Sequence, residues 1–179
     1  MVRRGSSFAA LLLVSLMACS GGDDGADADD EAEAAPVTVP DDADPGLGYL
    51  VLDGVPHLLQ VRDCSLEATT DPASGATTEV AIDADDSVSM AVSITRTVVP
   101  GDLSTTTDNI TIAENNQFAS ESQRVDISGN YQDLRAPGAL APLLQVDDTL
   151  VTASGVFGPY GSLAGDAGLV EGTLTIRCP

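Results

Sequence analysis

The sequence predicts an all-β fold, an antiparallel β-sandwich or open barrel with at most one short helix, over residues 47–179. Three observations lead to this prediction: short apolar runs are separated by turn residues, side-chain polarity alternates with a period of two, and helical periodicity is nearly absent. Only five aromatic residues and no tryptophan lie beyond residue 18, so Val, Ile and Leu must fill the core.

The first expected element is a hairpin. Two apolar segments, 49–52 and 55–61, are joined by Asp53-Gly54. Asp-Gly between apolar segments is a strong signal for a two-residue turn with positive φ angles. We therefore expect two antiparallel strands at the start of the domain.

The clearest strand pattern covers residues 88–95. Val88, Met90, Val92 and Ile94 alternate with Ser, Ala, Ser and Thr. A period of two places these four apolar side chains on one face of a sheet. Further strands are expected at 80–85, 109–113, 125–127, 149–157 and 168–178.

Two segments of the domain stay ambiguous. Residues 114–124 are polar and fit an exposed edge, a loop or a short helix. Residues 136–146 contain Pro137, Pro142 and a Leu-rich centre, and fit a short helix or a loop that acts as a lid.

The N-terminus has the features of a bacterial lipoprotein signal. Arg3 and Arg4 precede an apolar run, 8–17, which is too short to span a bilayer. Leu16-Met17-Ala18-Cys19 reads as a lipobox, so residues 1–18 are expected to be removed and Cys19 to carry the lipid. A buried helix and an ordinary secretory signal are the alternatives. The prediction is a protein held at the extracytoplasmic face of the cell membrane.

Residues 19–46 form the expected tether between the lipidated Cys19 and the domain. Ten acidic residues and no basic residue lie between Ser20 and Gly46, a composition that cannot bury a core and repels itself. As a flexible coil the tether spans roughly 26–31 Å. An acidic interaction tail and a cation-binding patch are the alternatives to a spacer.

The charge balance excludes some partners. Five arginines face 28 acidic residues in the mature chain, a formal net charge of −23, and lysine is absent. Nucleic-acid binding depends on Lys and Arg neutralising phosphates, so we expect no nucleic-acid partner. Docking on anionic headgroups is disfavoured for the same reason, which leaves the N-terminal lipid as the contact with the membrane.

The three cysteines fit the same interpretation. If Cys19 carries the lipid, Cys64 and Cys178 remain as a pair, and a disulfide between them persists outside the inner membrane. Both cysteines share a strand face with apolar residues. Two buried free thiols are the alternative.

Candidate catalytic and metal residues are few, and we predict no catalytic site, no metal site and no cofactor. His57 is the single histidine and is expected to be partly buried, although a catalytic triad would have to use it with Asp53 or Asp63. No Gly-x-Ser-x-Gly motif occurs. One histidine and two paired cysteines do not compose a zinc site.

Two acidic loops resemble the start of a calcium-binding loop. Asp83-x-Asp85-x-Ser87 and Asp126-x-Ser128-x-Asn130 lack the glycine at position six and the glutamate at position twelve. They are interpreted as incidental loop carboxylates. The glycine-rich segment 155–161 lacks the lysine of a phosphate-binding loop and is expected to be a bend or surface loop.

The layout as a whole resembles the mycobacterial nineteen-kilodalton lipoprotein antigen (LpqH-like) family. The resemblance rests on the lipobox at Cys19, a low-complexity tether, the hairpin motif Val51-Leu52-Asp53-Gly54, the strand at Cys64 and the terminal strand 172–178. It implies an exported, membrane-anchored β-rich domain with one disulfide and no established catalytic site. The tether departs from the Thr- and Ser-rich, glycosylated tethers of that family.

Three functions remain open at this point. The first is a non-enzymatic binding or interaction domain on a lipoprotein, with an unknown protein or lipid ligand. The second is an envelope carrier that holds an apolar, lipid-like ligand between its sheets, with the segment 139–146 as a lid. The third is a hydrolase that uses paired carboxylates.

Overall fold

A computed structural model describes residues 43–101, 104–127 and 129–179, and the predicted signal peptide, Cys19 and most of the predicted tether lie outside these residues. The described strands are β1 (Leu47–Leu52), β2 (Val55–Ser65), β3 (Thr69–Thr70), β4 (Thr77–Asp85), β5 (Met90–Val99), β6 (Thr105–Glu114), β7 (Gln117–Ile127), β8 (Tyr131–Asp133), β9 (Ala136–Leu140), β10 (Leu144–Asp147), β11 (Leu150–Phe157) and β12 (Val170–Arg177). The described part of the chain contains no helix, so the predicted all-β class is confirmed.

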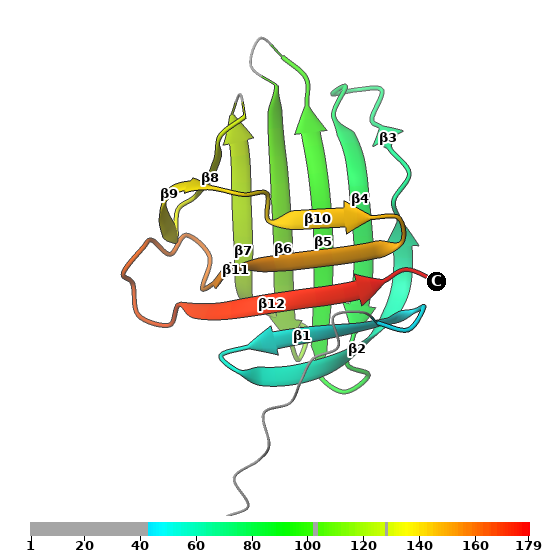
Figure 1. The fold of residues 1–179 in the computed structure, drawn as a ribbon, viewed down its shortest axis with the longest axis vertical. Coiled ribbons are helices and arrows are strands. Elements are labelled where there is room, and N and C mark those ends of the chain that lie inside the picture. Colours follow the sequence, from blue (N-terminus) through cyan, green and yellow to red (C-terminus); the bar gives the residue numbers. More distant parts are fainter. Residues whose placement is uncertain (1–42, 102–103, 128) are drawn as a thin grey trace, which may run out of the picture. The chain divides into compact units, whose positions relative to one another are not determined.

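One antiparallel sheet contains all of the strands. Its order is β10-β11-β12-β1-β2-β4-β5-β6-β7-β8-β9, and β3 pairs with β4. The sheet curls strongly, so that β10, β11 and β12 run across β4, β5 and β6 instead of beside them (Figure 1). This curled sheet is an open barrel, one of the two predicted architectures.

The core lies between the two halves of the curled sheet. Val92 and Ile94 of β5 lie opposite Ile112 and Ile110 of β6 on one half, and all four are at most 1% exposed. On the other half, Leu50 and Leu174 pair across β1 and β12 and are equally buried. One cluster of buried apolar residues joins both halves, so the period-two pattern of the sequence is what fills the interior.

The predicted first hairpin is confirmed. Leu52 pairs with Val55 across a two-residue turn, in which Asp53 has φ 48° and Gly54 has φ 77°. Both angles are positive, as a type I′ turn requires. Just before this hairpin, Ala43 is 4% exposed, and Gly46 donates a backbone hydrogen bond to Arg177 at 2.9 Å.

A disulfide closes one end of the sheet. Cys64 lies near the end of β2 and Cys178 directly follows β12, which are the two strands on either side of β1. Their Cα atoms are 5.9 Å apart, at the end where β1 begins. Cys178 is 6% exposed and belongs to the core cluster. The predicted pairing of Cys64 with Cys178 is confirmed.

The two ambiguous segments are both extended. Residues 115–116 form a turn and β7 continues from Gln117. The interpretation of residues 136–146 as a helix or lid is wrong, because they form β9 and β10 with a short connection between them. Leu143 and Leu144 are 1% exposed, so this segment supplies core side chains.

The curled sheet nearly closes where β7 meets the end of β11. Glu121 and Gly158 exchange two backbone hydrogen bonds, at 2.9 and 3.0 Å, as an isolated bridge. We call this meeting line, formed by residues 121–124, 133–135, 141–144 and 154–162, the seam. Few backbone hydrogen bonds cross it, because β10 is one edge strand of the sheet and the short strands β8 and β9 form the other edge (Figure 1).

Three arginines hold the seam. Arg124 donates to the carbonyl groups of Ala141 and Ser154 at 2.9 and 2.7 Å. Arg135 is 6% exposed and donates to Glu121 Oε1 at 2.6 Å and to Ser162 Oγ at 3.1 Å. These charge-assisted contacts replace the missing strand ladder.

The third arginine anchors the edge strand β10. Arg96 of β5 forms two hydrogen bonds with the carboxylate of Asp108 on β6, at 2.6 and 2.9 Å. The same pair binds both backbone groups of Leu144: Arg96 Nη2 donates to its carbonyl at 2.6 Å, and its N–H donates to Asp108 Oδ2 at 3.0 Å. Asp108 is 0% exposed, so this contact ties β10 to the opposite half of the sheet from inside.

Candidate binding hollow at the hairpin ends

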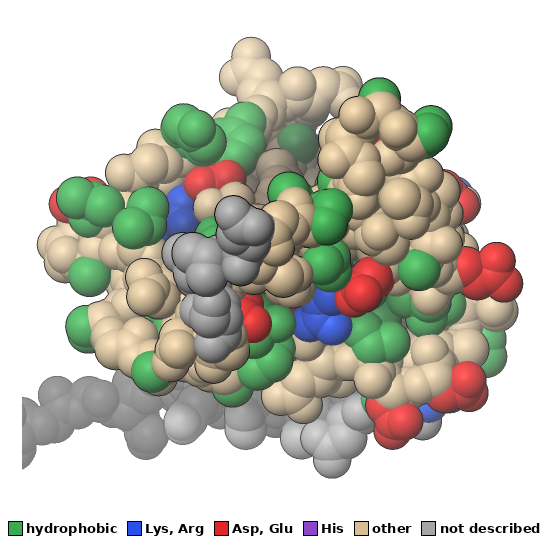
Figure 2. All heavy atoms as spheres, turned by 90° about the horizontal axis from the view of Figure 1, so that it is seen from above, with side chains coloured by type: hydrophobic (Ala, Val, Ile, Leu, Met, Phe, Trp, Pro, Cys, Tyr) green, Lys and Arg blue, Asp and Glu red, His purple; other side chains and the backbone are tan. Residues whose placement is uncertain are grey.

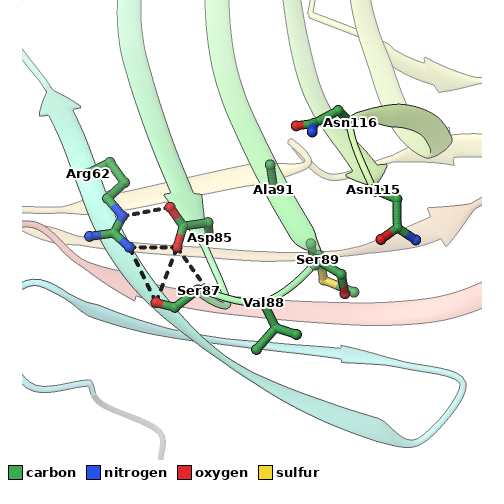
Figure 3. A pocket seen from close by; sticks show the side chains of 9 residues that line it. Arg62, Asp85, Ser87, Val88, Ser89, Ala91, Asn115 and Asn116 are labelled. Atoms are coloured by element: carbon green, nitrogen blue, oxygen red, sulfur yellow. Dashed lines mark hydrogen bonds and ion pairs between the residues drawn. The ribbon is translucent and has the colours of Figure 1, made fainter.

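A polar hollow lies where the β4–β5 and β6–β7 turns lie side by side at one end of the sheet (Figure 3). Its volume is about 580 Å³. The backbone N–H of Asn115 donates to the carbonyl of Ser89 at 2.8 Å and fixes the two turns to each other. The lining residues are Arg62, Asp85, Ser87, Val88, Ser89, Met90, Ala91, Asn115 and Asn116.

The turn between β4 and β5 forms the first wall, and the carboxylate of Asp86 fixes this turn. Its Oδ1 accepts hydrogen bonds from the backbone N–H groups of Val88, Ser89 and Met90, at 2.8, 2.8 and 2.9 Å. Because these bonds favour the charged form, they lower the pKa of Asp86 from its ordinary value. The turn is therefore fixed by one side chain before β5 begins at Met90.

This turn corrects the strand predicted at 88–95. The alternation predicts Val88 on the buried face with Met90, but Val88 is 89% exposed. The strand starts two residues later, because Asp86 holds the backbone of residues 88–90 in the turn. Met90, Val92 and Ile94 are buried as predicted.

The second wall is the turn between β6 and β7. Glu114 pairs with Gln117, so Asn115 and Asn116 are its two central residues, with φ angles of 51° and 61°. Asparagine tolerates this left-handed backbone better than most residues. Both side chains line the hollow, and neither makes a side-chain hydrogen bond to another described residue (Figure 3).

An exposed ion pair forms the opposite wall. Arg62 Nε and Nη2 donate to the two carboxylate oxygens of Asp85 at 2.6 and 2.9 Å, and Nη2 also donates to Ser87 Oγ at 3.2 Å (Figure 3). The guanidinium of Arg62 lowers the pKa of Asp85, and Asp85 raises the pKa of Arg62. This wall carries no net charge, because one unit of each sign is present.

The chemistry available in the hollow is hydrogen bonding. Its two ionised side chains are paired with each other, and the remaining polar groups are hydroxyls and amides. Across the described ranges, no three His, Cys, Asp or Glu side chains lie close enough together to hold a metal ion. The arrangement is suited to binding a polar molecule.

The residues weighed from sequence do not assemble into a site. His57 lies on β2 opposite Leu50 and is half-buried, and no hydrogen bond joins it to Asp53 or Asp63 in the described structure. The carboxylate of Asp85, in the first calcium-like loop, forms an ion pair with Arg62. Ser128 of the second such loop lies outside the described residues.

The sequence signal for the hollow is weak. Asn115-Asn116 between two apolar alternations is a hairpin signal, but the segment that contains it is ambiguous in the sequence. Nothing in the sequence places Arg62 beside this turn, because the contact depends on the pairing of β2 with β4. The seam arginines Arg96, Arg124 and Arg135 give no signal either.

The opposite end of the sheet carries both charged and hydrophobic side chains. Figure 2 shows this end from above, where the few basic side chains lie beside acidic ones and hydrophobic side chains are scattered.

Among the described residues, no helix is long and apolar enough to cross a bilayer.

Fold and hollow together define a small, disulfide-bonded antiparallel β domain with a polar surface hollow. A family model described as the leukemia inhibitory factor receptor N-terminal domain matches residues 52–129. The match runs from the end of β1 through β7 and covers less than half of the chain, so it shows a local similarity. No curated protein and no solved structure matches the chain.

Proposed function

We propose that the protein is an exported lipoprotein, anchored by a lipid on Cys19 at the extracytoplasmic face of the membrane. The observation that carries this proposal is the disulfide between Cys64 and Cys178. It uses two of the three cysteines and leaves Cys19, inside a lipobox, as the single cysteine for the lipid. A disulfide of this kind also fits an oxidising compartment.

The domain itself is proposed as a non-enzymatic binding domain. Arg62, Arg96 and Arg135 are each paired with a carboxylate in the described structure, and the hollow offers neutral hydrogen-bonding groups. Paired arginines also fit the expectation that the domain does not bind nucleic acid. The similarity to the N-terminal domain of a receptor supports a binding role.

Membership in the LpqH-like family is part of the proposal. Its support is the order of features along the chain: the lipobox, the low-complexity tether, the Asp53-Gly54 hairpin, the cysteine on β2 and the cysteine that follows β12. The two cysteines implied to pair by the resemblance are bridged across the start of β1.

The packing argues against the carrier alternative, which requires an enclosed apolar pocket of about 300 Å³ or more. The space between the two halves of the sheet is filled by side chains such as Leu59, Ile94 and Ile176, each 0% exposed. The hollows of about 230 to 630 Å³ formed by the described residues open onto the surface. The segment 139–146, suggested as a lid, contributes to β9 and β10.

The anchor is tested by replacing the proposed lipidation site. In a bacterium that lipidates exported proteins, Cys19→Ser protein is expected in the soluble fraction without incorporated fatty acid, whereas the wild type sediments with membranes. The matched control is Ser20→Ala, which changes the residue beside Cys19, keeps the cysteine itself and is expected to stay in the membrane fraction. Membrane-bound Cys19→Ser protein contradicts the proposal.

A further inference from the structure

We propose that the hollow between the β4–β5 and β6–β7 turns binds an uncharged, polyhydroxylated ligand, that is, a neutral saccharide unit. The inference deepens the proposed binding role of the domain and does not depend on the lipid anchor. It rests on the charge, the hydrogen-bonding groups and the position of this hollow.

Charge selects a neutral ligand. Arg62 and Asp85 are the only ionised side chains among the described residues that line the hollow, and they neutralise each other at 2.6 Å. The neighbouring carboxylate of Asp86 is directed to three backbone N–H groups of its own turn. An anionic ligand would meet these carboxylates in a strongly acidic protein, and a cationic ligand would have to compete with Arg62 for Asp85.

Hydrogen-bonding capacity selects hydroxyl groups. The side chains of Asn115, Asn116 and Ser89 make no hydrogen bond to other described residues, and all three line the hollow. Each amide offers two donors and an acceptor, and a serine hydroxyl offers both roles. Sugar hydroxyls likewise donate and accept, so adjacent hydroxyls can each find a partner across the hollow (Figure 3).

The position of the hollow disfavours an extended peptide. Peptides commonly bind by adding a strand to a free sheet edge. The residues that line the hollow belong to β2, β4, β5 and the two turns, and both β4 and β5 are paired on both sides within the sheet. A ligand here must therefore be recognised by side chains rather than by a strand ladder.

Two small apolar side chains at the hollow offer a further contact for a sugar ring. Ala91 lies between the two polar walls and Val88 is 89% exposed at the hollow, so both can contact the C–H face of a sugar ring (Figure 3). No aromatic side chain of the described residues lines the hollow. We therefore expect weak binding, with dissociation constants in the millimolar range.

The test is ligand-observed saturation-transfer NMR on the full chain as purified, in a detergent without a sugar headgroup. The probes are trehalose, maltose and lactose, and the charged comparators are glucose 6-phosphate and glucosamine. We expect saturation transfer to at least one neutral disaccharide and weaker transfer to both comparators.

The decisive variant is Asn115→Gly/Asn116→Gly. Glycine adopts the positive φ angles of this turn without strain, so both amides are removed while the hairpin is kept. Asp148→Gly is the matched control, because Asp148 has φ 54° in the turn between β10 and β11 and does not line the hollow. The double variant should bind the disaccharide at least tenfold more weakly, and the control should bind like the wild type.

Three results would overturn the inference: no transfer to any of the neutral disaccharides, stronger transfer to a charged comparator, or unchanged binding by the double variant with an unchanged unfolding midpoint. The fractionation of Cys19→Ser protein is a separate result. Failed sugar binding with a confirmed anchor rejects the ligand class alone, and a failed anchor leaves the ligand class standing.

Discussion

The curled sheet is closed at two places by different means. At the start of β1, the disulfide between Cys64 and Cys178 joins β2 to the residue that follows β12. At the seam, Arg96, Arg124 and Arg135 join strands that share almost no backbone ladder. The disulfide is covalent and involves one pair of residues. The seam depends on desolvated arginine charges, and each of these arginines binds several partners.

The difference teaches how a domain with few cations uses them. Beyond residue 18 the chain has five arginines and no lysine, yet three of them, Arg96, Arg124 and Arg135, contact the residues of the seam. A guanidinium can bind a carboxylate and backbone carbonyls at once, which suits a junction where strands diverge. The cost is that each such contact fails if one partner is removed, because the other is left buried and charged.

The largest expected effect is the loss of the covalent closure. Cys64→Ser/Cys178→Ser opens a loop with a sequence separation of 114 residues. The chain-entropy model expects the free energy of unfolding to fall by roughly 4–5 kcal/mol. Urea denaturation measures the change. An effect below that of the seam variants would show that the electrostatic closure is the stronger of the two.

The next expected effect comes from Arg96→Met. It leaves the carboxylate of Asp108, 0% exposed, without a counter-charge. Unfolding free energy should fall by about 3–5 kcal/mol, measured in the same denaturation series.

Arg96→Met/Asp108→Asn is the matched control for this variant. The amide that replaces the Asp108 carboxylate is uncharged, and its oxygen can still accept from the Leu144 N–H, so part of the stability should return. If the two variants are equally unstable, buried charge is not the cause.

A smaller effect is expected where the seam is tight. A Cβ at Gly155 would lie 2.5 Å from Ser122 Oγ and 2.8 Å from Leu143 Cδ1. Gly155→Ala should lower the free energy of unfolding by roughly 1–3 kcal/mol through overpacking. Ser154→Ala, next to it on the exposed face, serves as the control and should be close to neutral. Equal free energies of unfolding for the two variants would show that the seam accommodates the added methyl group without loss of stability.

The pH dependence of stability tests the turn between β4 and β5, which lies outside both the disulfide and the seam. The pKa of Asp86 is lowered in the folded protein, so its contribution is present above the unfolded-state pKa and is lost as pH falls through the folded-state pKa. Asp86→Asn should be less stable than the wild type at neutral pH and show a shallower loss of its unfolding midpoint toward about pH 2. Parallel acid profiles of the two proteins would contradict this assignment.

The smallest effect is expected for the exposed ion pair. Arg62 and Asp85 form the same two-bond contact as Arg96 and Asp108, but in solvent. Arg62→Met should leave the thermal unfolding midpoint unchanged within error, since water and salt screen such pairs. A loss comparable with that of Arg96→Met would show that burial is not what separates the two pairs.

Sequence reasoning succeeds where the signal is local. The alternation in residues 90–94, the Asp53-Gly54 turn and the strand that ends at Cys178 all follow from the geometry of a strand or a two-residue turn. It fails at Val88 and at residues 136–146. At Val88, the carboxylate of Asp86 accepts hydrogen bonds from the backbone and keeps it in a turn. At residues 136–146, packing against the core and the contact of Leu144 with the Arg96–Asp108 pair stabilise two strands in a segment whose sequence pattern is ambiguous.

By itself, the sequence determined the all-β class, the first hairpin and the pairing of Cys64 with Cys178. These depend on spacing, composition and the number of cysteines, which are properties of the chain alone. Only the tertiary structure decided the curl of the sheet, the seam and the hollow beside Asn115 and Asn116. Their contacts join residues such as Arg62 with Asp85 and Arg96 with Leu144, and a strand pattern carries no information about which distant strands will meet.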